Sequence, residues 1–212
     1  MEQTKNCVFC DRAQFEERLC GETKDFWIIA TLGQIPKNGG YILLVPKRHV
    51  ECVGAIKNTE IPRLGFSMNW LLSSVIDAVF CEYDVAHGTI FEHGIVGQTI
   101  KHAHLHLVPA VINFTDRVRK DFPVNEIISV KSWNALQKLY SKRQEPYLLW
   151  PNTNRGGEML TCWNPAAPPQ YLRTVVAEAL GVPERANWRN MDPELDKKLW
   201  SETVTRLKPY FK

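Results

Sequence analysis

The sequence predicts a fold that combines antiparallel β-strands with α-helices. Two apolar segments, residues 26–30 and 41–46, flank a turn rich in Pro, Asn and Gly, as the strands of a hairpin or meander do. From about residue 62 to 82, apolar side chains recur every three or four positions, which is typical of a helix with one wide buried face. Within residues 98–109, histidines alternate strictly with apolar residues, which is typical of a strand.

The composition limits the classes of protein to which this chain could belong. The chain has 212 residues, 44% of them hydrophobic, which is enough to bury one sizeable core. Its 26 basic and 23 acidic residues give a formal charge of +3, so charge alone does not support RNA as a partner. We find no apolar run of membrane-spanning length and no apolar signal core at the N-terminus, and we therefore expect a cytoplasmic protein without a membrane contact. Four isolated cysteines are expected as buried fillers: Cys20, Cys52, Cys81 and Cys162.

The alternation centres on three histidines. On a strand, one face carries the histidines and the other carries apolar residues: His102, His104 and His106 against Ala103, Leu105 and Leu107. A histidine-rich solvated strand or a fortuitous alternation is the alternative interpretation. Three imidazoles on one face are hard to explain by packing, and near neutral pH an imidazole is a base, a nucleophile or a metal ligand.

These residue types suit reaction at phosphorus. A neutral imidazole attacks an activated phosphate to give a phosphohistidine, which splits one hard step into two. His104 is flanked by a histidine on either side and is the best nucleophile, with His106 as a phosphate-binding donor or orienting group. Gln98 and Thr99 are expected to bind non-bridging oxygens and to position the leaving group.

Near the N-terminus, Cys7 and Cys10 form a C-x-x-C pair. The spacing suits two thiolate ligands of one zinc ion, and a redox pair is the alternative. A zinc ion needs two further ligands, for which His49 and His102 are candidates.

Residues 97–109, GQTIKHAHLHLVP, closely resemble the signature of the histidine triad (HIT) family of nucleotide hydrolases and transferases. Residues 40–49, GYILLVPKRH, resemble the family's strand that ends in P-K-x-H, and residues 7–10 resemble the start of its zinc-bearing members. The resemblance implies an α+β fold in which an antiparallel sheet and a long helix bind a nucleotide. It covers about the first 110 residues, so we expect a catalytic domain at 1–112 and a C-terminal extension, 113–212, packed on it.

The resemblance also implies roles for individual residues. His104 becomes the nucleophile that takes a nucleoside monophosphate from a P–O–P or P–N linkage, as in dinucleoside polyphosphates or nucleoside phosphoramidates. Water or phosphate is the acceptor, and a nucleotide- or RNA-binding module with little turnover is the alternative. A structural zinc ion would bind to four side chains: Cys7, Cys10, His49 and His102.

Several positions depart from the family pattern. Tyr41 follows Gly40 where the family commonly has histidine, and Glu92 and His93 stand near the position of a common asparagine. Gln34 is a candidate to substitute for the residue that holds the ribose in relatives.

The C-terminal half has a weaker pattern. We expect an irregular segment at 111–122, a short helix at 131–142 and a strand pair at 147–150 and 160–163. We also expect an amphipathic helix at 171–180 and a last helix ending near Pro209. Residues 168–173 and 180–189 resemble the tail of a longer HIT-like group. This tail is expected to cover the nucleotide site or to occupy the face through which small members form homodimers. Three of its arginines are candidate phosphate ligands: Arg173, Arg185 and Arg189.

Overall fold

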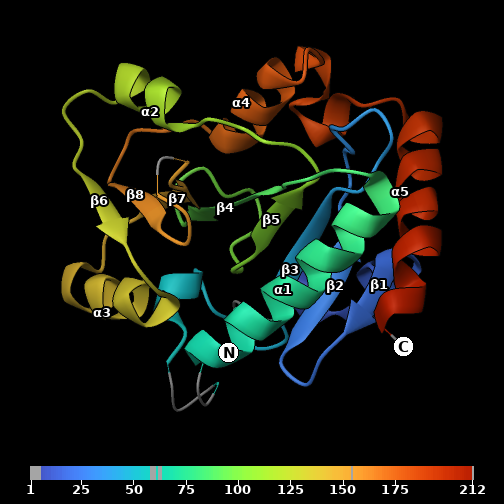
Figure 1. Cartoon of the computed structure of the whole chain (residues 1–212), viewed down its shortest axis with the longest axis horizontal. Helices are drawn as coiled ribbons and strands as arrows, with labels where there is room; N and C mark the ends of the chain where they lie inside the picture. The colour runs from blue at the N-terminus through green and yellow to red at the C-terminus, as the bar shows by residue number, and fades with distance from the viewer. Residues whose placement is uncertain (1–5, 58–60, 62–63, 154, 212) are drawn as a thin grey trace.

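The computed structural model describes residues 6–57, 61, 64–153 and 155–211. In these ranges the protein has a mixed α+β fold built on one antiparallel sheet of eight strands, in the order β1-β2-β3-β5-β4-β7-β8-β6 (Figure 1). The strands are β1 Leu19–Glu22, β2 Phe26–Ala30, β3 Ile42–Pro46, β4 Thr89–Gly94, β5 Leu105–Val108, β6 Ile127–Val130, β7 Tyr147–Pro151 and β8 Met159–Trp163. The α-helices are α1 Leu64–Tyr83, α2 Thr115–Asp121, α3 Trp133–Arg143, α4 Tyr171–Ala179 and α5 Pro193–Leu207.

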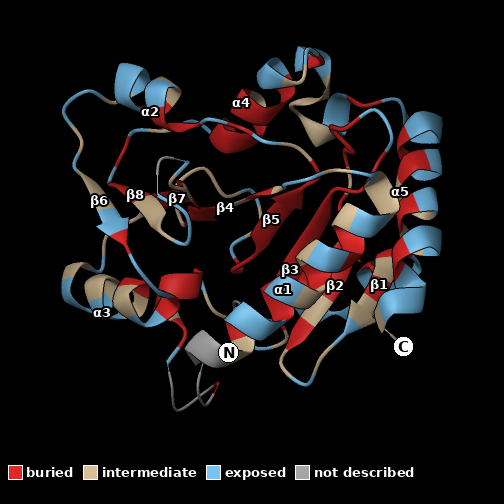
Figure 2. Ribbon diagram, in the orientation of Figure 1, coloured by how far each residue is buried: buried red, intermediate tan, exposed pale blue. Residues whose placement is uncertain are grey.

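The predicted strand pair and long helix are confirmed. β2 and β3 pair antiparallel over their whole lengths, with Ile28 opposite Leu44. Alternate residues of these strands face opposite ways: Ile28 and Leu44 join the core beneath α1, whereas Ile29 and Leu43 join a second core. Helix α1 runs diagonally across the first face (Figure 1), and its expected start at Pro62 lies outside the described residues. Two buried cores therefore sandwich the sheet, whose central strands are buried along their length (Figure 2).

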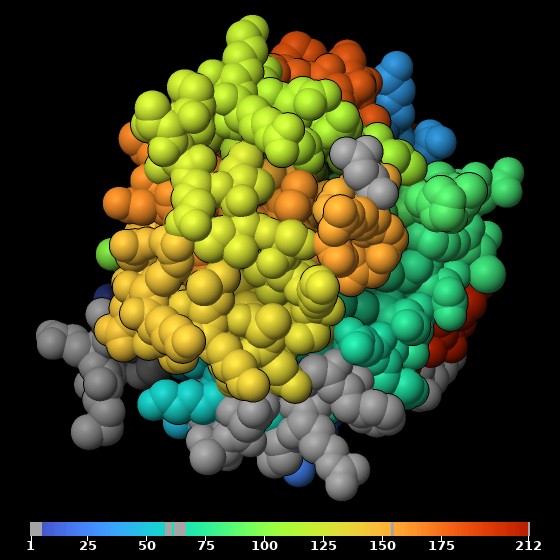
Figure 3. Space-filling view, turned by 60° about the vertical axis from the view of Figure 1, so that its left-hand side comes forward, coloured from blue at the N-terminus to red at the C-terminus, as the bar shows by residue number. Residues whose placement is uncertain are grey.

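The C-terminal half contributes to both layers. β7 pairs with β4, and β8 pairs with β7 and β6, so three strands of this half continue the sheet beyond β4. The segment from α2 through β8 forms a continuous surface next to α1 (Figure 3). Helix α4 packs with the second core through residues such as Leu172 and Val176, and α5 lies beside β1 and β2.

Two local expectations are wrong. Residues 111–122 are not wholly irregular, because Thr115–Asp121 form α2; only two of its residues, Thr115 and Val118, are buried, too few to produce an apolar period. The histidine-bearing strand is also shorter than expected, since β5 begins at Leu105. If the register continued, Ala103 would lie opposite Pro46, which has no N–H to donate; the backbone N–H of Ala103 donates instead to the Val50 carbonyl.

Two sequence expectations concern the cysteines and membranes. Cys20, Cys52 and Cys162 are buried as expected, whereas Cys81 is exposed, and all are free thiols. Among the helices of the described ranges, none has the length and apolar character needed to span a membrane.

Candidate functional site

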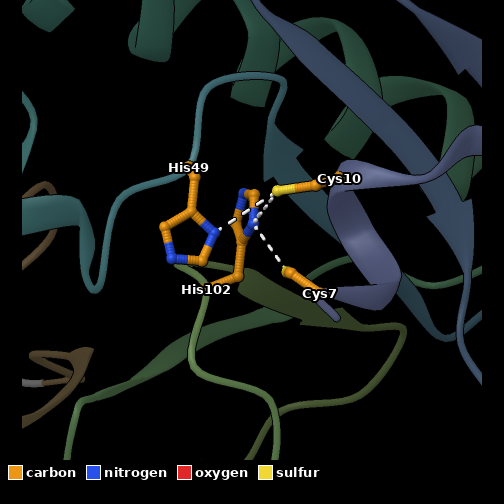
Figure 4. Close-up of side chains that lie close together, drawn as sticks. All are labelled: Cys7, Cys10, His49 and His102. Atoms are coloured by element: carbon orange, nitrogen blue, oxygen red, sulfur yellow. Dashed lines mark hydrogen bonds between the residues drawn. The ribbon is translucent and has the colours of Figure 1, made fainter. Parts of the chain in front are cut away.

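The first histidine of the triad lies in a cluster with the N-terminal cysteines (Figure 4). Cys7 immediately precedes a single 3₁₀ turn that ends at Cys10, His49 follows β3, and His102 precedes β5. The Sγ of Cys7 lies 3.3 Å from Nδ1 of His102, and the Sγ of Cys10 lies 3.3 Å from Nδ1 of His49. One ligand atom from each of these four side chains lies within 4.8 Å of the other three, so segments distant in sequence converge on one point.

This donor set fits a tetrahedral metal ion. A zinc ion with two sulfur and two nitrogen ligands holds its sulfur and nitrogen atoms about 3.5 Å apart, close to the S–N spacings observed here. The Nε2 of His102 donates to the Pro46 carbonyl at 2.8 Å, which leaves Nδ1 as the ligand nitrogen. Burial, followed by the adjacent Cys7, raises the pKa of Cys10 to about 11, and a bound cation would reverse this resistance to ionisation. The cluster can therefore bind a metal ion.

The second histidine of the triad is held in one tautomer. The Nδ1 of His104 lies 2.6 Å from the His102 carbonyl oxygen, and because a carbonyl only accepts, Nδ1 carries the proton. Burial lowers the pKa of His104 to about 4, so the ring is neutral near pH 7 and Nε2 keeps its lone pair. His104 is thus an imidazole whose Nε2 can attack an electrophile or accept a proton.

The third histidine, His106 on β5, is packed among aromatic side chains. Its ring stacks on Phe91 at 4.5 Å between centroids and lies 4.8 Å from the His104 ring. Its Nδ1 shares a hydrogen bond of 2.7 Å with the Tyr41 hydroxyl, and its Nε2 is buried without a partner among the described residues. Burial, with the nearby His104, His93 and Arg173, lowers the pKa of His106 well below its usual value.

A cavity of about 650 Å³ opens over His104 and His106. Four basic side chains contribute to its lining: Arg18, Lys101, Arg173 and Arg189. Among the described residues that line it there is no aspartate or glutamate, so the cavity is electropositive although the whole chain is nearly balanced in charge. Phe9 and Trp188 add aromatic surface, and such a cavity suits an anion that also carries a ring.

Gln98 and Thr99 lie on the wall of this cavity with His104 and His106. The Gln98 amide nitrogen donates to the Glu51 carbonyl at 2.9 Å, which ties the loop before the triad to the loop after His49.

Gln34, the candidate ribose-binding residue, is not among the residues that line the cavity. Its buried side-chain amide bonds to three backbone groups, the carbonyls of Thr31 and Tyr41 and the N–H of Tyr41, and so closes the turn between β2 and β3.

Of the candidate tail arginines, two reach the cavity and one does not. Arg173 and Arg189 line it, whereas Arg185 donates to the carbonyls of Ile35 and Pro36 beneath the β2–β3 turn. Helix α2 carries three basic residues, Arg117, Arg119 and Lys120, that are not among the residues lining the cavity, and Arg117 pairs with Asp121 and Glu178.

The sequence marked His93 only as a position that departs from the family pattern and indicated no particular role for it. His93 lines the cavity, and its Nε2 accepts from the backbone N–H of Leu172 at the start of α4. Its neighbour Glu92 points to the opposite face of the sheet, where it accepts from Val53 N and the Tyr147 hydroxyl. Sequence reasoning missed three other residues near the triad, Arg18, Tyr41 and Trp188. They come from separate segments of the chain, and no local sequence pattern indicates that these segments lie close together.

Comparison with known proteins identifies the family. The family described as "Scavenger mRNA decapping enzyme C-term binding" matches residues 6–116, which is more than half of the chain and includes the metal-ligand cluster and the triad. The chain belongs to the histidine triad family. Its residues from 117 onward lie outside that match.

Individual relatives are distant. The uncharacterized HIT-like protein MJ0866 of Methanocaldococcus jannaschii is 24% identical over 103 residues, which are 49% of this chain and 78% of that protein. A hypothetical histidine triad nucleotide-binding protein of Sulfolobus tokodaii is 21% identical with a TM-score of 0.40, covering 49% of this chain and 68% of its own. A HIT family protein of Bacillus anthracis is 21% identical with a TM-score of 0.41, covering 66% and 95%.

Proposed function

We propose that this HIT protein is a nucleotide hydrolase or transferase that forms a nucleotidyl intermediate on His104. The observation that carries the proposal is the tautomer of His104: Nδ1–H donates to the His102 carbonyl, and the Nε2 lone pair belongs to a ring on the wall of an electropositive cavity. A neutral imidazole with a fixed orientation is a competent nucleophile.

The reaction has two displacements at phosphorus. First, Nε2 of His104 attacks the phosphorus next to the nucleoside, an N–P bond forms, and the P–O or P–N bond to the leaving group breaks. A leaving amine takes up one proton from solvent in this step, and the proton that water loses in the second step returns it. Water then attacks the nucleotidyl-histidine and loses a proton as the N–P bond breaks, which releases a nucleoside monophosphate and restores the neutral ring. Inorganic phosphate in place of water makes the protein a phosphorylase.

The surrounding residues would stabilise the charge that develops on the phosphoryl oxygens. His106, Gln98 and Thr99 lie on the same wall as His104, and Arg173 is a buried cation. No carboxylate of the described residues forms an ion pair with Arg173. A buried charge without a counter-ion is costly, and a phosphate would supply that counter-ion.

The first prediction is that replacing His104 abolishes turnover. His104→Ala should lower kcat by at least about 10³-fold, because the nucleophile is lost. The measurement is product formation from a panel of dinucleoside polyphosphates and nucleoside phosphoramidates, with AMP binding followed in parallel.

His87→Ala is the matched control, because His87 is an exposed histidine packed on Phe80 and remote from the cavity. Retained turnover in His104→Ala would contradict the assignment of the nucleophile. Binding of AMP by the folded wild type without turnover of any member of the panel would leave the alternative, a nucleotide- or RNA-binding module.

We also propose that the metal in the Cys7, Cys10, His49 and His102 cluster is zinc, in a structural role. Two thiolates and two imidazoles leave no open position on a tetrahedral ion, which is typical of structural zinc. When bound, the ion would join the N-terminal turn, the loop after β3 and His102, whose carbonyl orients His104. The ion would thus hold the His102 carbonyl in place, and with it the orientation of His104, without contacting the substrate.

The second prediction follows from this site. Protein purified without chelator should contain one zinc per chain, and Cys7→Ser should lose it together with several degrees of Tm. Cys81→Ser, at an exposed cysteine, is the control and should retain both. Metal analysis that finds no zinc, or equal zinc in Cys7→Ser, would rule the proposal out.

A further inference from the structure

We propose that Tyr41, backed by Arg173 of the C-terminal half, is a positioning residue that fixes His106 as an Nε2–H donor facing the substrate phosphate. The tautomer stands on contacts within the protein alone, whereas its use in catalysis rests on the proposed function. The inference joins two residues far apart in sequence to the last histidine of the triad.

The contact between Tyr41 and His106 is buried on all sides. Tyr41 is fully buried, and its hydroxyl lies 2.7 Å from Nδ1 of His106. Burial raises the pKa of Tyr41 to about 12, so the phenol keeps its hydrogen near neutral pH. That buried hydrogen needs an acceptor.

His106 is the acceptor that the structure offers. The other side chain that faces the Tyr41 hydroxyl is Arg173, and a guanidinium only donates, so it cannot accept the phenol hydrogen. If Nδ1–H donated to Tyr41 instead, the phenol hydrogen and Nε2 of His106 would both be without partners. If Tyr41 donates to Nδ1, only Nε2 of His106 remains unpaired.

Arg173 favours the same direction. Its guanidinium carbon lies 5.1 Å from the centre of the Tyr41 ring, and its Nη2 and Nε donate to the carbonyls of Gly33 and Ala186. The cation opposes the burial-driven rise in the pKa of Tyr41, which places its charge close to the phenol oxygen. A cation at that oxygen attracts its lone pairs and turns the O–H away, toward His106.

The result is a pair of neighbouring imidazoles with complementary Nε2 atoms. His104 carries its proton on Nδ1 and offers a lone pair at Nε2, whereas His106 accepts at Nδ1 and offers a hydrogen at Nε2. The two rings lie 4.8 Å apart on one cavity wall. One nitrogen attacks phosphorus while the other donates to a non-bridging oxygen as its charge grows.

The direct test is the protonation pattern of His106 in the free protein, read by long-range ¹H–¹⁵N correlation of the histidine rings. His106→Gln identifies the signals of that ring. We expect wild-type His106 to carry its hydrogen on Nε2 with an unprotonated Nδ1, and Tyr41→Phe and Arg173→Gln to mix the two tautomers. Tyr171→Phe is the control, because its hydroxyl bonds Asp121 away from the cavity, and it should leave the pattern unchanged.

Kinetics test the catalytic use. Tyr41→Phe should lower kcat by about 10- to 100-fold and leave KM roughly unchanged, because the donor matters most as charge develops. Nδ1–H on wild-type His106 would overturn the proposal, and that spectrum decides the tautomer even if Tyr41→Phe does not fold. A folded Tyr41→Phe with wild-type kcat would overturn the positioning role, whereas a wild type without turnover would refute the proposed function and leave the tautomer assignment standing.

Discussion

At the scale of single residues, each buried histidine near the cavity owes its tautomer to a partner on the backbone or on a phenol. His102 donates from Nε2 to the Pro46 carbonyl, and His104 donates from Nδ1 to the His102 carbonyl. The Nε2 of His93 accepts from Leu172 N–H, so its hydrogen is on Nδ1. Burial lowers the pKa of His93 to about 3 and that of His102 to about 4, so these rings act as neutral groups.

Glu92 is a buried carboxylic acid that does not face the cavity, and its burial raises its pKa to about 7. The folded protein therefore holds this proton more tightly than the unfolded chain does. The stability that Glu92 contributes is greatest below the unfolded pKa, near 4.5, and is lost as the pH rises through about 7. We predict that this one group lowers the free energy of unfolding by about 3 kcal/mol between pH 4 and pH 8.

Glu92→Gln tests this, since an amide oxygen still accepts from Val53 N and nothing titrates. Urea unfolding at pH 5 and pH 8 should show a smaller loss of stability in the variant than in the wild type. The exposed Glu194→Gln on α5 should lose as much stability as the wild type. An equal pH dependence in Glu92→Gln would show that the carboxyl is ionised throughout.

At the scale of elements, α5 and the segment after α4 support the turn between β2 and β3. The Asp196 carboxylate accepts from the N–H groups of Gly33 and Gln34, and the Thr203 hydroxyl accepts from Gly40 N–H just before Tyr41. Gly33 has a φ of +70°, and a Cβ there would lie 2.4 Å from Cβ of Trp188. The turn and the C-terminal segment therefore approach too closely for any other residue.

We predict that Asp196→Ala costs about 3 kcal/mol, because two buried N–H groups lose a charged acceptor. Asp192→Ala is the matched control on the same helix: its exposed carboxylate caps α5 by accepting from Leu195 N–H, and its loss should cost about 1 kcal/mol. Chemical denaturation of both variants gives the comparison. Equal losses would mean that the turn does not depend on α5.

Elements with a strong local pattern could be predicted from the sequence, and those held by distant partners could not. The strands at 26–30 and 147–150 and the helix at 171–180 have clear apolar runs or periods and were placed to within a residue or two. Strand β6 has only four residues and is defined by its pairing with β8, while β1 is defined by its pairing with β2. These strands form because of their partner strands, and the local propensity of a segment carries no information about its partner.

At the scale of the whole molecule, the sheet continues from the family-matched region into the C-terminal half. The β4 edge pairs with β7, and Tyr147 of β7 donates to the buried Glu92 of β4. The division at residue 112 remains a prediction, as does a homodimer. We predict that a chain ending at residue 112 fails to unfold cooperatively, because the edge of β4 and one face of the second core would be exposed. A cooperative thermal transition for residues 1–112 would contradict this.

The residues of the candidate site also fall into two groups, those within local sequence motifs and those brought together only by the fold. The triad and the C-x-x-C pair are local motifs, so the sequence pointed to His104, His106 and the four residues of the candidate metal site before any contact was known. The roles of Tyr41 and His93, and the joining of Arg173 to them, depend on segments that meet only after folding. Gln34 was a plausible sequence candidate because of its position, yet its amide is committed to the backbone.

The measurement that tests the central claim most directly is the intact mass of the protein after millisecond mixing with a dinucleoside polyphosphate, followed by peptide mapping. We predict a mass increase of one nucleotidyl group, located on His104, that decays as product forms and is absent in His104→Ala. An adduct on another residue, or turnover without any adduct at times shorter than one catalytic cycle, would contradict covalent catalysis by His104.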